Sequence, residues 1–243
     1  MRENPKSCGL EAVLVKSLAF FTLDLTITCA PGKTVVLTGP SGSGKSTVLR
    51  CLAGLEQIDD GYIRFNNVPW NDVSSGLHAK SQNRAIGFLS QDYSLFPHMT
   101  LSRNIRFAMQ GSGDPDEHLD AMGIGHLRNR RPHEISGGER QRAALCQTLA
   151  RCPKLLLLDE PFSALDIENR HLLRQKLQEV QTQSGLPIIQ VTHDLIEALT
   201  VSTHIISLHQ GREDHSWLQR QKRLFAKDMK HAQGTYSPEA LSA

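Results

Sequence analysis

One glycine-rich stretch sets the architecture of this 243-residue chain: Thr38-Gly39-Pro40-Ser41-Gly42-Ser43-Gly44-Lys45-Ser46-Thr47. It follows the apolar, β-branched run Thr34–Leu37 and precedes Val48–Ala53, which has the residues of a helix. A strand, a glycine-rich loop and a helix in this order form the setting in which G-x-x-x-x-G-K-[ST] binds phosphate. The glycines let the backbone curl so that its N–H groups point at an anion, and the helix dipole adds to the attraction. A chance glycine-rich turn would not have both flanks, so the stretch predicts a nucleotide site.

The acidic residues that such a site needs follow a second buried strand. Lys154–Pro161 contains four leucines in a row, a pattern typical of a strand buried on both faces. Asp159 and Glu160 come at its carboxyl end, where ligands bind in open parallel sheets. Asp159 is suited to hold Mg²⁺ through water, and Glu160 to polarise an attacking water. The alternative is a pair of charges that merely cap the strand, and a nearby phosphate loop makes it the weaker one. In that loop Lys45 can reach the β- and γ-phosphates and Ser46 can contact Mg²⁺.

Composition limits the classes of partner. The net charge is +2 and the aromatic content 5%, and neither indicates a nucleic-acid surface. Five scattered cysteines without a C-x-x-C pair indicate a reducing compartment, with no disulfide framework and no zinc site. Met1–Lys6 has no apolar segment behind it, and no run approaches the roughly 18 apolar residues of a membrane span. We therefore expect a cytosolic protein that contacts a membrane only through a partner.

The pattern along the chain predicts an α/β fold with an inserted helical part. Alternating apolar residues indicate strands at Glu11–Val15 and Leu23–Thr28. Further strands are expected at 62–65 after a turn at 59–61, and at 84–91, 188–193 and 205–208. Helices are expected from Thr100, over 115–122, after Ser136 and over 168–183, with a loop at 111–116. In the last of these helices, Leu173, Leu177 and Val180 form an apolar stripe that we expect in the core.

These elements predict three parts of the chain. Residues 1–90 and 151–211 form an α/β nucleotide-binding core that includes an antiparallel β part near the N-terminus. Residues 91–150 form the inserted helical subdomain. Residues 212–243 form a docking helix and a loose tail, with no regulatory domain. The expected anchors of that helix are Trp217, Leu218, Leu224 and Phe225.

Four other residues have two interpretations each. Gln91 and His193 follow predicted buried strands; a polar strand end is usually solvated, and a lone histidine is usually structural. Phe20 and Phe21 lie between the first two strands, where we expect at least one of them in the core. The alternative is that one of them stacks on an adenine ring.

The segment Glu134-Ile135-Ser136-Gly137-Gly138-Glu139-Arg140-Gln141-Arg142 opens a helix with a serine and two glycines, which makes a second anion-binding N-terminus. With the motifs above, it resembles the ATP-binding subunit of an ABC transporter over residues 10–211. The resemblance implies a P-loop NTPase core, ATP and Mg²⁺ as cofactors, and a head-to-tail homodimer. In that dimer Ser136, Gly137 and Gly138 would cap the γ-phosphate that the opposite subunit binds.

The resemblance also assigns roles to individual residues. The phosphate loop comprises Gly39, Pro40, Ser41, Gly42, Ser43, Gly44, Lys45, Ser46 and Thr47. The metal contacts are Ser46, Asp159 and Gln91; the catalytic residues are Glu160, His193 and Gln91. The loop Ser163–Asp166 crosses the dimer interface with Asp166 near the nucleotide, and Phe20 is preferred to Phe21 as the adenine-stacking residue.

The same resemblance names the partners. Residues 92–104 look like the surface that receives the membrane-embedded permease subunits, so the chain is expected at the cytoplasmic face of the membrane. An extracytoplasmic substrate-binding protein would act indirectly, and no nucleic acid is expected. Glu139 and Ile135 depart from the usual Gln and Leu of the signature without implying loss of activity. Trp70–Asp72 and the stretch from Gln91 are similar to molybdate, tungstate and sulfate importers, while thiamine, polyamine or iron importers are the alternative. A non-transport ABC ATPase is a remote alternative because no coiled-coil insertion or second cassette is visible.

Overall fold

The strand that leads into the phosphate loop, β3 (Thr34–Thr38), lies inside a mainly parallel sheet, with every residue buried. The computed structural model describes residues 9–235. Within them this sheet has six strands in the order β11-β10-β3-β9-β8-β7. The other members are β7 (Ile86–Leu89), β8 (Leu155–Asp159), β9 (Ile188–Val191), β10 (His204–His209) and β11 (Arg212–Glu213). All neighbours pair in parallel except β10 and β11, so the carboxyl ends of β7, β8, β9 and β3 meet at one edge.

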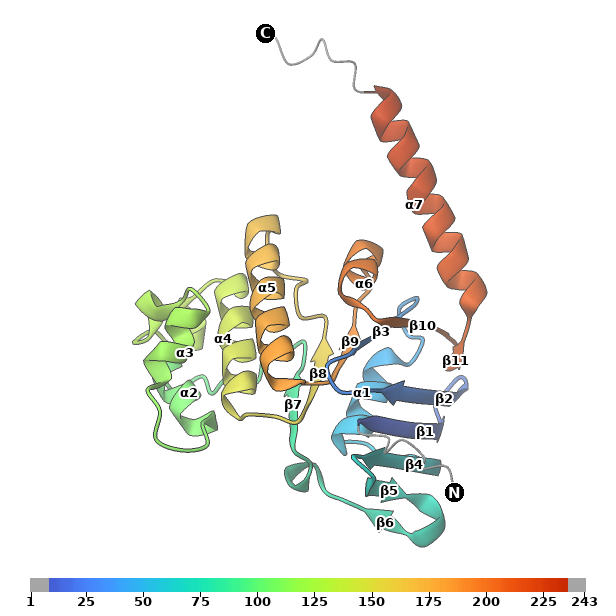
Figure 1. Ribbon diagram of the computed structural model, residues 1–243, viewed down its shortest axis with the longest axis horizontal. Coiled ribbons are helices and arrows are strands. Elements are labelled where there is room, and N and C mark those ends of the chain that lie inside the picture. The colour runs from blue at the N-terminus through green and yellow to red at the C-terminus, as the bar shows by residue number, and fades with distance from the viewer. Residues whose placement is uncertain (1–8, 236–243) are drawn as a thin grey trace.

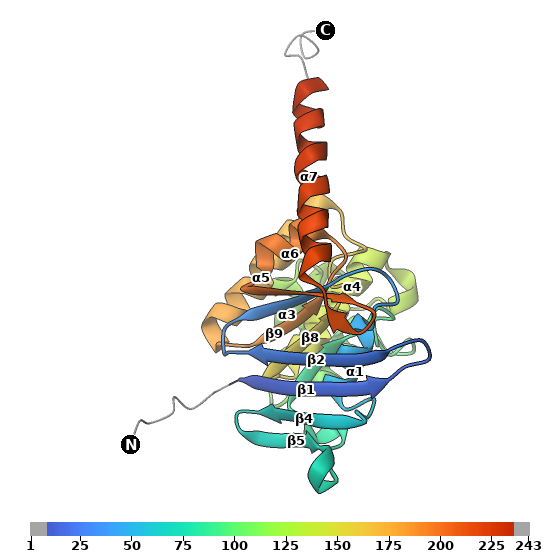
Figure 2. The ribbon, with the colours of Figure 1, turned by 90° about the vertical axis from the view of Figure 1, so that its right-hand side faces the viewer.

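A second sheet, in the described residues five-stranded and antiparallel, has the order β2-β1-β4-β5-β6 (Figure 1; Figure 2 shows β2, β1, β4 and β5 from the side). Its strands are β1 (Leu10–Ser17), β2 (Thr22–Cys29), β4 (Asp60–Phe65), β5 (Val68–Asp72) and β6 (Leu77–His78). Strand β2 alternates exposed and buried residues along its whole length, as a half-buried strand requires. This sheet confirms the predicted antiparallel β part, but β4 begins at Asp60, inside the turn expected at 59–61.

Helices α2 (Leu101–Ala108), α3 (Pro115–Ala121) and α4 (Gly137–Ala150) form a block on the opposite side of β8 from the antiparallel sheet (Figure 1). Strand β8 separates two hydrophobic clusters: Leu155 and Leu157 belong to one, and Leu156 and Leu158 to the other. The expected loop at 111–116 is shorter than predicted, because Asp114 caps α3 and Pro115 begins it.

Three further α-helices follow β8 in the described chain. The stripe of α5 (Ile167–Ser184) is in the core as predicted, with Leu173 and Leu177 buried and Val180 packed against them. Helix α6 (Leu195–Val201) was not predicted; it is short and starts directly after the loop that follows β9. Helix α7 (His215–Thr235) projects away from the rest of the molecule (Figure 1). Of its expected anchors Trp217, Leu218 and Phe225 are half-buried, whereas Leu224 is exposed.

The helix after the phosphate loop, α1 (Lys45–Ala53), is held at its C-terminus by a buried arginine. Arg84 Nη1 donates to the carbonyl oxygens of Cys51 and Leu52 at 3.0 and 2.6 Å. Its guanidinium also lies over the Trp70 ring, 5.7 Å from the centroid. Burial lowers the pKa of Arg84 to about 10. The cation therefore satisfies the C-terminal carbonyls of the helix whose N-terminus follows the predicted phosphate loop.

Among the described residues, Cys29, Cys51, Cys146 and Cys152 are free thiols. Cys8, Met1–Lys6 and the last part, 236–243, of the helix and tail expected at 212–243 lie outside the described residues. Over residues 9–235, no helix is both long and apolar enough to cross a bilayer.

Candidate nucleotide site

The phosphate loop depends on glycine at two kinds of position. Gly39 has φ +141°, and a Cβ there would lie 2.1 Å from the carbonyl oxygen of Leu208. Gly42 and Gly44 have φ +76° and +104°, conformations that side chains disfavour. The loop therefore has the curled backbone that was predicted, with α1 starting at Lys45 immediately after it.

Lys45 lies folded over this loop. Its Nζ donates to the carbonyl oxygens of Gly39 and Pro40, at 3.0 and 2.8 Å, and lies 3.4 Å from Ser43 Oγ. Burial lowers the pKa of Lys45, while the negative charges of Glu160 and Asp159 oppose that shift. The ammonium group is thus held by neutral acceptors that a phosphate group can replace.

Phe20 and Phe21 have different environments. The Phe20 side chain is 96% exposed, whereas Phe21 is half-buried and packs against the glycines of the loop and of the β10–β11 turn. Both line an open depression of about 330 Å³ together with Ala19, Gly42, Lys45, Ser46 and Thr47. A free aromatic face beside the phosphate loop fits the preference for Phe20 as a base-stacking residue.

Asp159 has a carboxyl oxygen that is available to bind a cation. The residue is 6% exposed, and its buried Oδ1 has no hydrogen-bond partner among the residues that the structure describes. Burial raises the pKa of Asp159, while a hydrogen bond from Ser46 and the charge of Lys45 oppose that shift. An unpartnered carboxyl oxygen next to a serine hydroxyl fits a divalent cation that prefers oxygen ligands. Gln91 is exposed two residues beyond the end of β7, which pairs with β8, so it lies at the same edge of the sheet.

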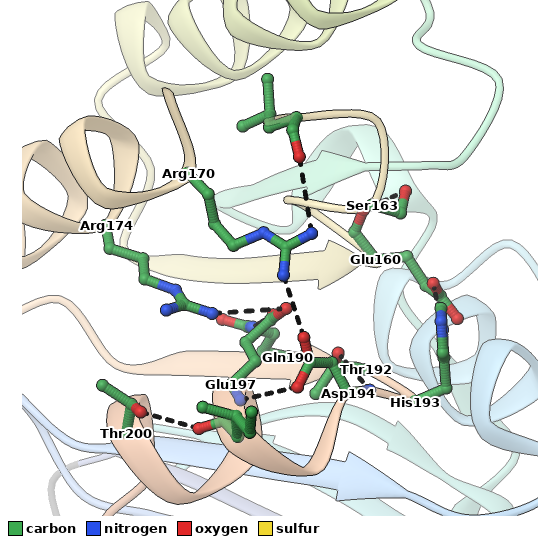
Figure 3. Close-up of polar contacts among 12 residues, drawn as sticks. Glu160, Ser163, Arg170, Arg174, Gln190, Thr192, His193, Asp194, Glu197 and Thr200 are labelled. Atoms are coloured by element: carbon green, nitrogen blue, oxygen red, sulfur yellow. Dashed lines mark hydrogen bonds and ion pairs between the residues drawn. The ribbon is translucent and has the colours of Figure 1, made fainter. Parts of the chain in front are cut away.

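Glu160 and His193 are brought together. His193 Nδ1 lies 2.6 Å from Glu160 Oε2, although 33 residues separate them in sequence (Figure 3). The imidazole is 69% exposed and the carboxylate 15% exposed, so His193 faces solvent while Glu160 is largely enclosed. Both residues follow neighbouring parallel strands, and the Glu160 N–H donates to the Val191 carbonyl at 3.0 Å.

The backbone of Glu160 is strained and well supported. Its φ is +54°, which costs about 1–3 kcal/mol for a residue with a side chain. Two side chains donate to its carbonyl oxygen, Ser163 Oγ at 3.1 Å and Gln141 Nε2 at 3.1 Å. Gln141 is fully buried and had no assigned role in the sequence interpretation. The one signal in the sequence for a role of Gln141 was a polar residue among the mostly apolar residues that α4 buries.

The signature segment forms a separate helix N-terminus. Ser136 caps α4, and its backbone N–H and Oγ both donate to Glu139 Oε2 at 2.8 Å. These hydrogen bonds lower the pKa of Glu139. Ser136 is exposed, and α4 lies in the helical block rather than beside α1 (Figure 1). Within the described part of the chain, the signature segment and the phosphate loop thus precede two different helices, α4 and α1.

Asp166 also has a local structural role. It caps α5 by accepting a hydrogen bond from Asn169 N at 2.8 Å, and hydrogen bonds with Asn169 lower its pKa. The preceding Leu165 contacts the signature segment, since a Cβ on Gly138 would lie 3.1 Å from Leu165 Cδ2. The loop Ser163–Asp166 thus lies between Glu160 and the signature segment.

A family comparison supplies the remaining observation. Residues 22–163 match the family described as ABC transporter, which is more than half of the chain.

The chain belongs to the ABC transporter family.

Similar curated proteins of this ABC family have a more specific description. A molybdenum import ATP-binding protein of Methylococcus capsulatus is 38% identical over 198 residues, covering 79% of this chain and 55% of that protein. One from Azotobacter vinelandii is 35% identical over 210 residues, covering 84% of this chain and 58% of the relative. The chain thus spans somewhat more than half the length of these relatives.

Solved structures confirm the fold. An ATP-binding subunit of an ABC transporter superposes with a TM-score of 0.73 at 24% identity, covering 90% of this chain and 93% of the other. A dimeric ATP-binding cassette in a post-hydrolysis state with ADP and phosphate has a TM-score of 0.71 at 25% identity, covering 86% and 98%. The predicted P-loop NTPase core with an antiparallel β part and an inserted helical part is confirmed.

Proposed function

We propose that this chain is an ATP-hydrolysing subunit that powers import of an oxyanion, molybdate or a chemically similar ion, across the cytoplasmic membrane. The observation that carries the ATPase assignment is the Glu160–His193 contact of 2.6 Å at the sheet edge where the phosphate loop begins. The solute rests on the similarity to molybdenum import proteins of two bacteria.

The proposed reaction starts with ATP on the phosphate loop. Lys45 exchanges its carbonyl acceptors for the β- and γ-phosphates, and the backbone N–H groups of Gly39 and of residues 41–47 surround them. Phe20 stacks on the adenine. Mg²⁺, when bound, would neutralise phosphate charge, and Ser46, Asp159 and Gln91 are the residues that would hold it.

Hydrolysis follows from positioning. Glu160 accepts a proton from the attacking water, and His193 keeps that carboxylate in place and faces the γ-phosphate. In a head-to-tail homodimer, Ser136, Gly137 and Gly138 of the second copy close over the same phosphate and exclude water. Asp166 lies at that interface. The separation of the signature segment from the phosphate loop within one chain supports a site completed by a second copy.

The proposed organisation assigns residues 1–90 and 151–211 to the nucleotide-binding core, 91–150 to the helical subdomain and 212–243 to a C-terminal helix and tail. Residues 92–104 would contact the permease. Buried Asn104 supports this role because it fixes the loop shape, accepting from Phe96 N at 2.7 Å and donating to Thr100 O at 3.0 Å. The chain would act at the cytoplasmic face of the membrane, with an extracytoplasmic binding protein as the indirect partner.

The test compares ATP turnover and ATP binding in the same preparations. We expect Glu160→Gln to lower kcat by roughly 10²–10⁴-fold while ATP still binds. Undiminished turnover at unchanged ATP affinity would refute the assignment of Glu160. Membranes purified with the tagged chain in mild detergent should yield a permease, and molybdate with its binding protein should stimulate turnover. Stimulation by thiamine, a polyamine or iron instead would change the solute, and a soluble partner would indicate a non-transport ATPase.

A further inference from the structure

A network of charged side chains joins α5 to the loop that carries His193 (Figure 3). Arg170, in the first turn of α5, donates Nη1 to Asp194 Oδ2 at 3.0 Å. Both side chains are 29% exposed, so the pair is only partly screened by solvent. Asp194 directly follows His193 in the chain.

Asp194 divides its two carboxyl oxygens between two tasks. Oδ1 accepts from Glu197 N at 3.1 Å and caps α6, whereas Oδ2 receives Arg170. Its backbone N–H donates to Thr192 Oγ1 at 3.1 Å. The residues on both sides of His193 are therefore fixed: the Thr192 N–H donates to the Leu37 carbonyl of β3 at 3.2 Å, and Arg170 attaches Asp194 to α5.

The second arm of the same guanidinium reaches the loop expected at the dimer interface. Arg170 Nη2 donates to the carbonyl oxygen of Leu165 at 3.4 Å. Leu165 belongs to Ser163–Asp166, and Ser163 Oγ donates to the carbonyl oxygen of Glu160. A small cavity of about 60 Å³ separates these loops, lined by Glu160, Ser163, Arg170, Thr192, His193, Asp194 and Glu197. The planar guanidinium of Arg170 thus donates one nitrogen to each of the two loops that flank the Glu160–His193 pair.

We propose that Arg170 is a positioning residue, whose guanidinium holds the loop Ser163–Asp166 and the loop bearing His193 at a fixed separation. This inference rests on the proposed ATPase function for its kinetic consequence and on the hydrogen bonds alone for its structural one. Arg170 acts through His193 and does not itself contact the nucleotide. Movement of Ser163–Asp166, at the interface between two copies, is thereby transmitted to the γ-phosphate contact.

The chain offers variants that separate this role from general stability. Arg170→Met removes both donor arms, whereas Arg170→Lys keeps the charge but has no planar fork to reach both acceptors. Asp194→Asn keeps a good helix cap but loses the charge that Arg170 meets. Lys176→Met is the matched control, because Lys176 is on the same helix and, among residues 9–235, pairs only with Glu179, at 2.9 Å.

Two measurements test the proposal. We expect Arg170→Met to lower kcat by roughly 10- to 100-fold with little change in KM for ATP, Arg170→Lys to restore part of it, and Lys176→Met to leave it unchanged. In a His193→Ala background, Arg170→Met should cause no further decrease in kcat. Hydrogen–deuterium exchange should accelerate in both 163–166 and 192–194 in Arg170→Met and Asp194→Asn, and in neither segment in Lys176→Met.

The outcomes are distinguishable from those that test the proposed function. Equal losses of kcat with and without His193 would overturn the positioning role, as would an effect confined to KM. If the wild-type chain hydrolyses no more ATP than Lys45→Ala, the proposed function fails. Hydrogen–deuterium exchange alone then tests whether Arg170 couples the two loops. Unchanged exchange in either loop of Arg170→Met would overturn that coupling. If Arg170→Met does not fold, Asp194→Asn and Arg170→Lys give the same comparisons.

Discussion

The side-chain amide of Gln141 donates a partly buried hydrogen bond of 3.1 Å to the backbone carbonyl of Glu160. Gln141 is in α4, five residues after the Ser136 cap, and Glu160 follows β8. The helix that presents the signature segment is therefore bonded directly to the strained residue proposed to activate water. In the proposed two-copy assembly, the signature segment of one copy contacts the nucleotide bound by the other copy, whereas Glu160 acts on the nucleotide of its own copy. This hydrogen bond would therefore link the two nucleotide sites.

Replacing Gln141 with Leu should affect turnover more than folding. The Gln141 Oε1 atom is buried without a partner, and the Glu160 carbonyl keeps its hydrogen bond from Ser163, so we expect the unfolding free energy to change by about 1 kcal/mol or less. We expect kcat to fall about tenfold as the left-handed conformation of Glu160 loses a support. Gln147→Leu is the control, since Gln147 is on the same helix but lies near Asn104. A large loss of stability with unchanged kcat would contradict this prediction.

The two neighbouring phenylalanines should separate binding from stability. Phe20→Ala should weaken ATP binding by roughly 5- to 100-fold, because stacking on an aromatic side chain contributes about 1–3 kcal/mol per base. It should leave the melting temperature unchanged, since the side chain is 96% exposed. Phe21→Ala should instead lower the melting temperature. Titration with ATP and with inorganic tripolyphosphate makes the comparison, because only ATP has a base; equal losses for both ligands would rule out stacking.

Stability should depend on pH through Glu197. Burial raises the pKa of this carboxyl to about 7 in the folded chain, despite Arg174, against about 4.5 when unfolded. Between these values the folded state retains a proton that the unfolded state has lost. Stability from this group is therefore fully present below about pH 4.5 and is lost as pH rises through 7.

Glu197→Gln removes that titration. Relative to the wild type, the variant should gain about 2–3 kcal/mol of unfolding free energy between pH 5 and pH 8. Denaturant titrations at the two pH values measure the difference. Glu179→Gln, at an exposed position of α5, should show no such change. An identical pH profile for Glu197→Gln and the wild type would exclude Glu197 as the source.

Glu139 should oppose assembly of two copies. Its carboxylate is held at the Ser136 cap, where the γ-phosphate of the other copy is expected. Glu139→Gln should therefore strengthen ATP-dependent dimerisation in a Glu160→Gln background, and the effect should shrink as salt is raised. Light scattering at two ionic strengths measures it. Weaker dimerisation at low salt would show that the cap matters more than the charge.

Patterns confined to a few neighbouring residues predicted the fold well. The buried runs at Thr34–Leu37 and Leu155–Leu158, the glycine loop and the Ser136 cap all formed where the sequence indicated. Helix α6 was missed because it has seven residues and no clear apolar stripe; the Asp194 cap starts it. Gln141 was missed as a site residue because its partner is a backbone carbonyl oxygen. Arg170 was missed because it contacts a loop that is distant in the sequence. Such contacts depend on how α4, α5 and β8 pack, which periodicity does not encode.

The predicted phosphate site depends on the buried Arg84 as well as on the residues at its surface. Helix α1 is nine residues long, so about 13 Å separates the loop amides from the carbonyls that Arg84 satisfies. The helix dipole that attracts an anion at one end is balanced by a buried cation at the other, far from any nucleotide. A substitution of Arg84 should therefore change the affinity for nucleotide from within the hydrophobic interior, at a position that no inspection of the binding surface would select.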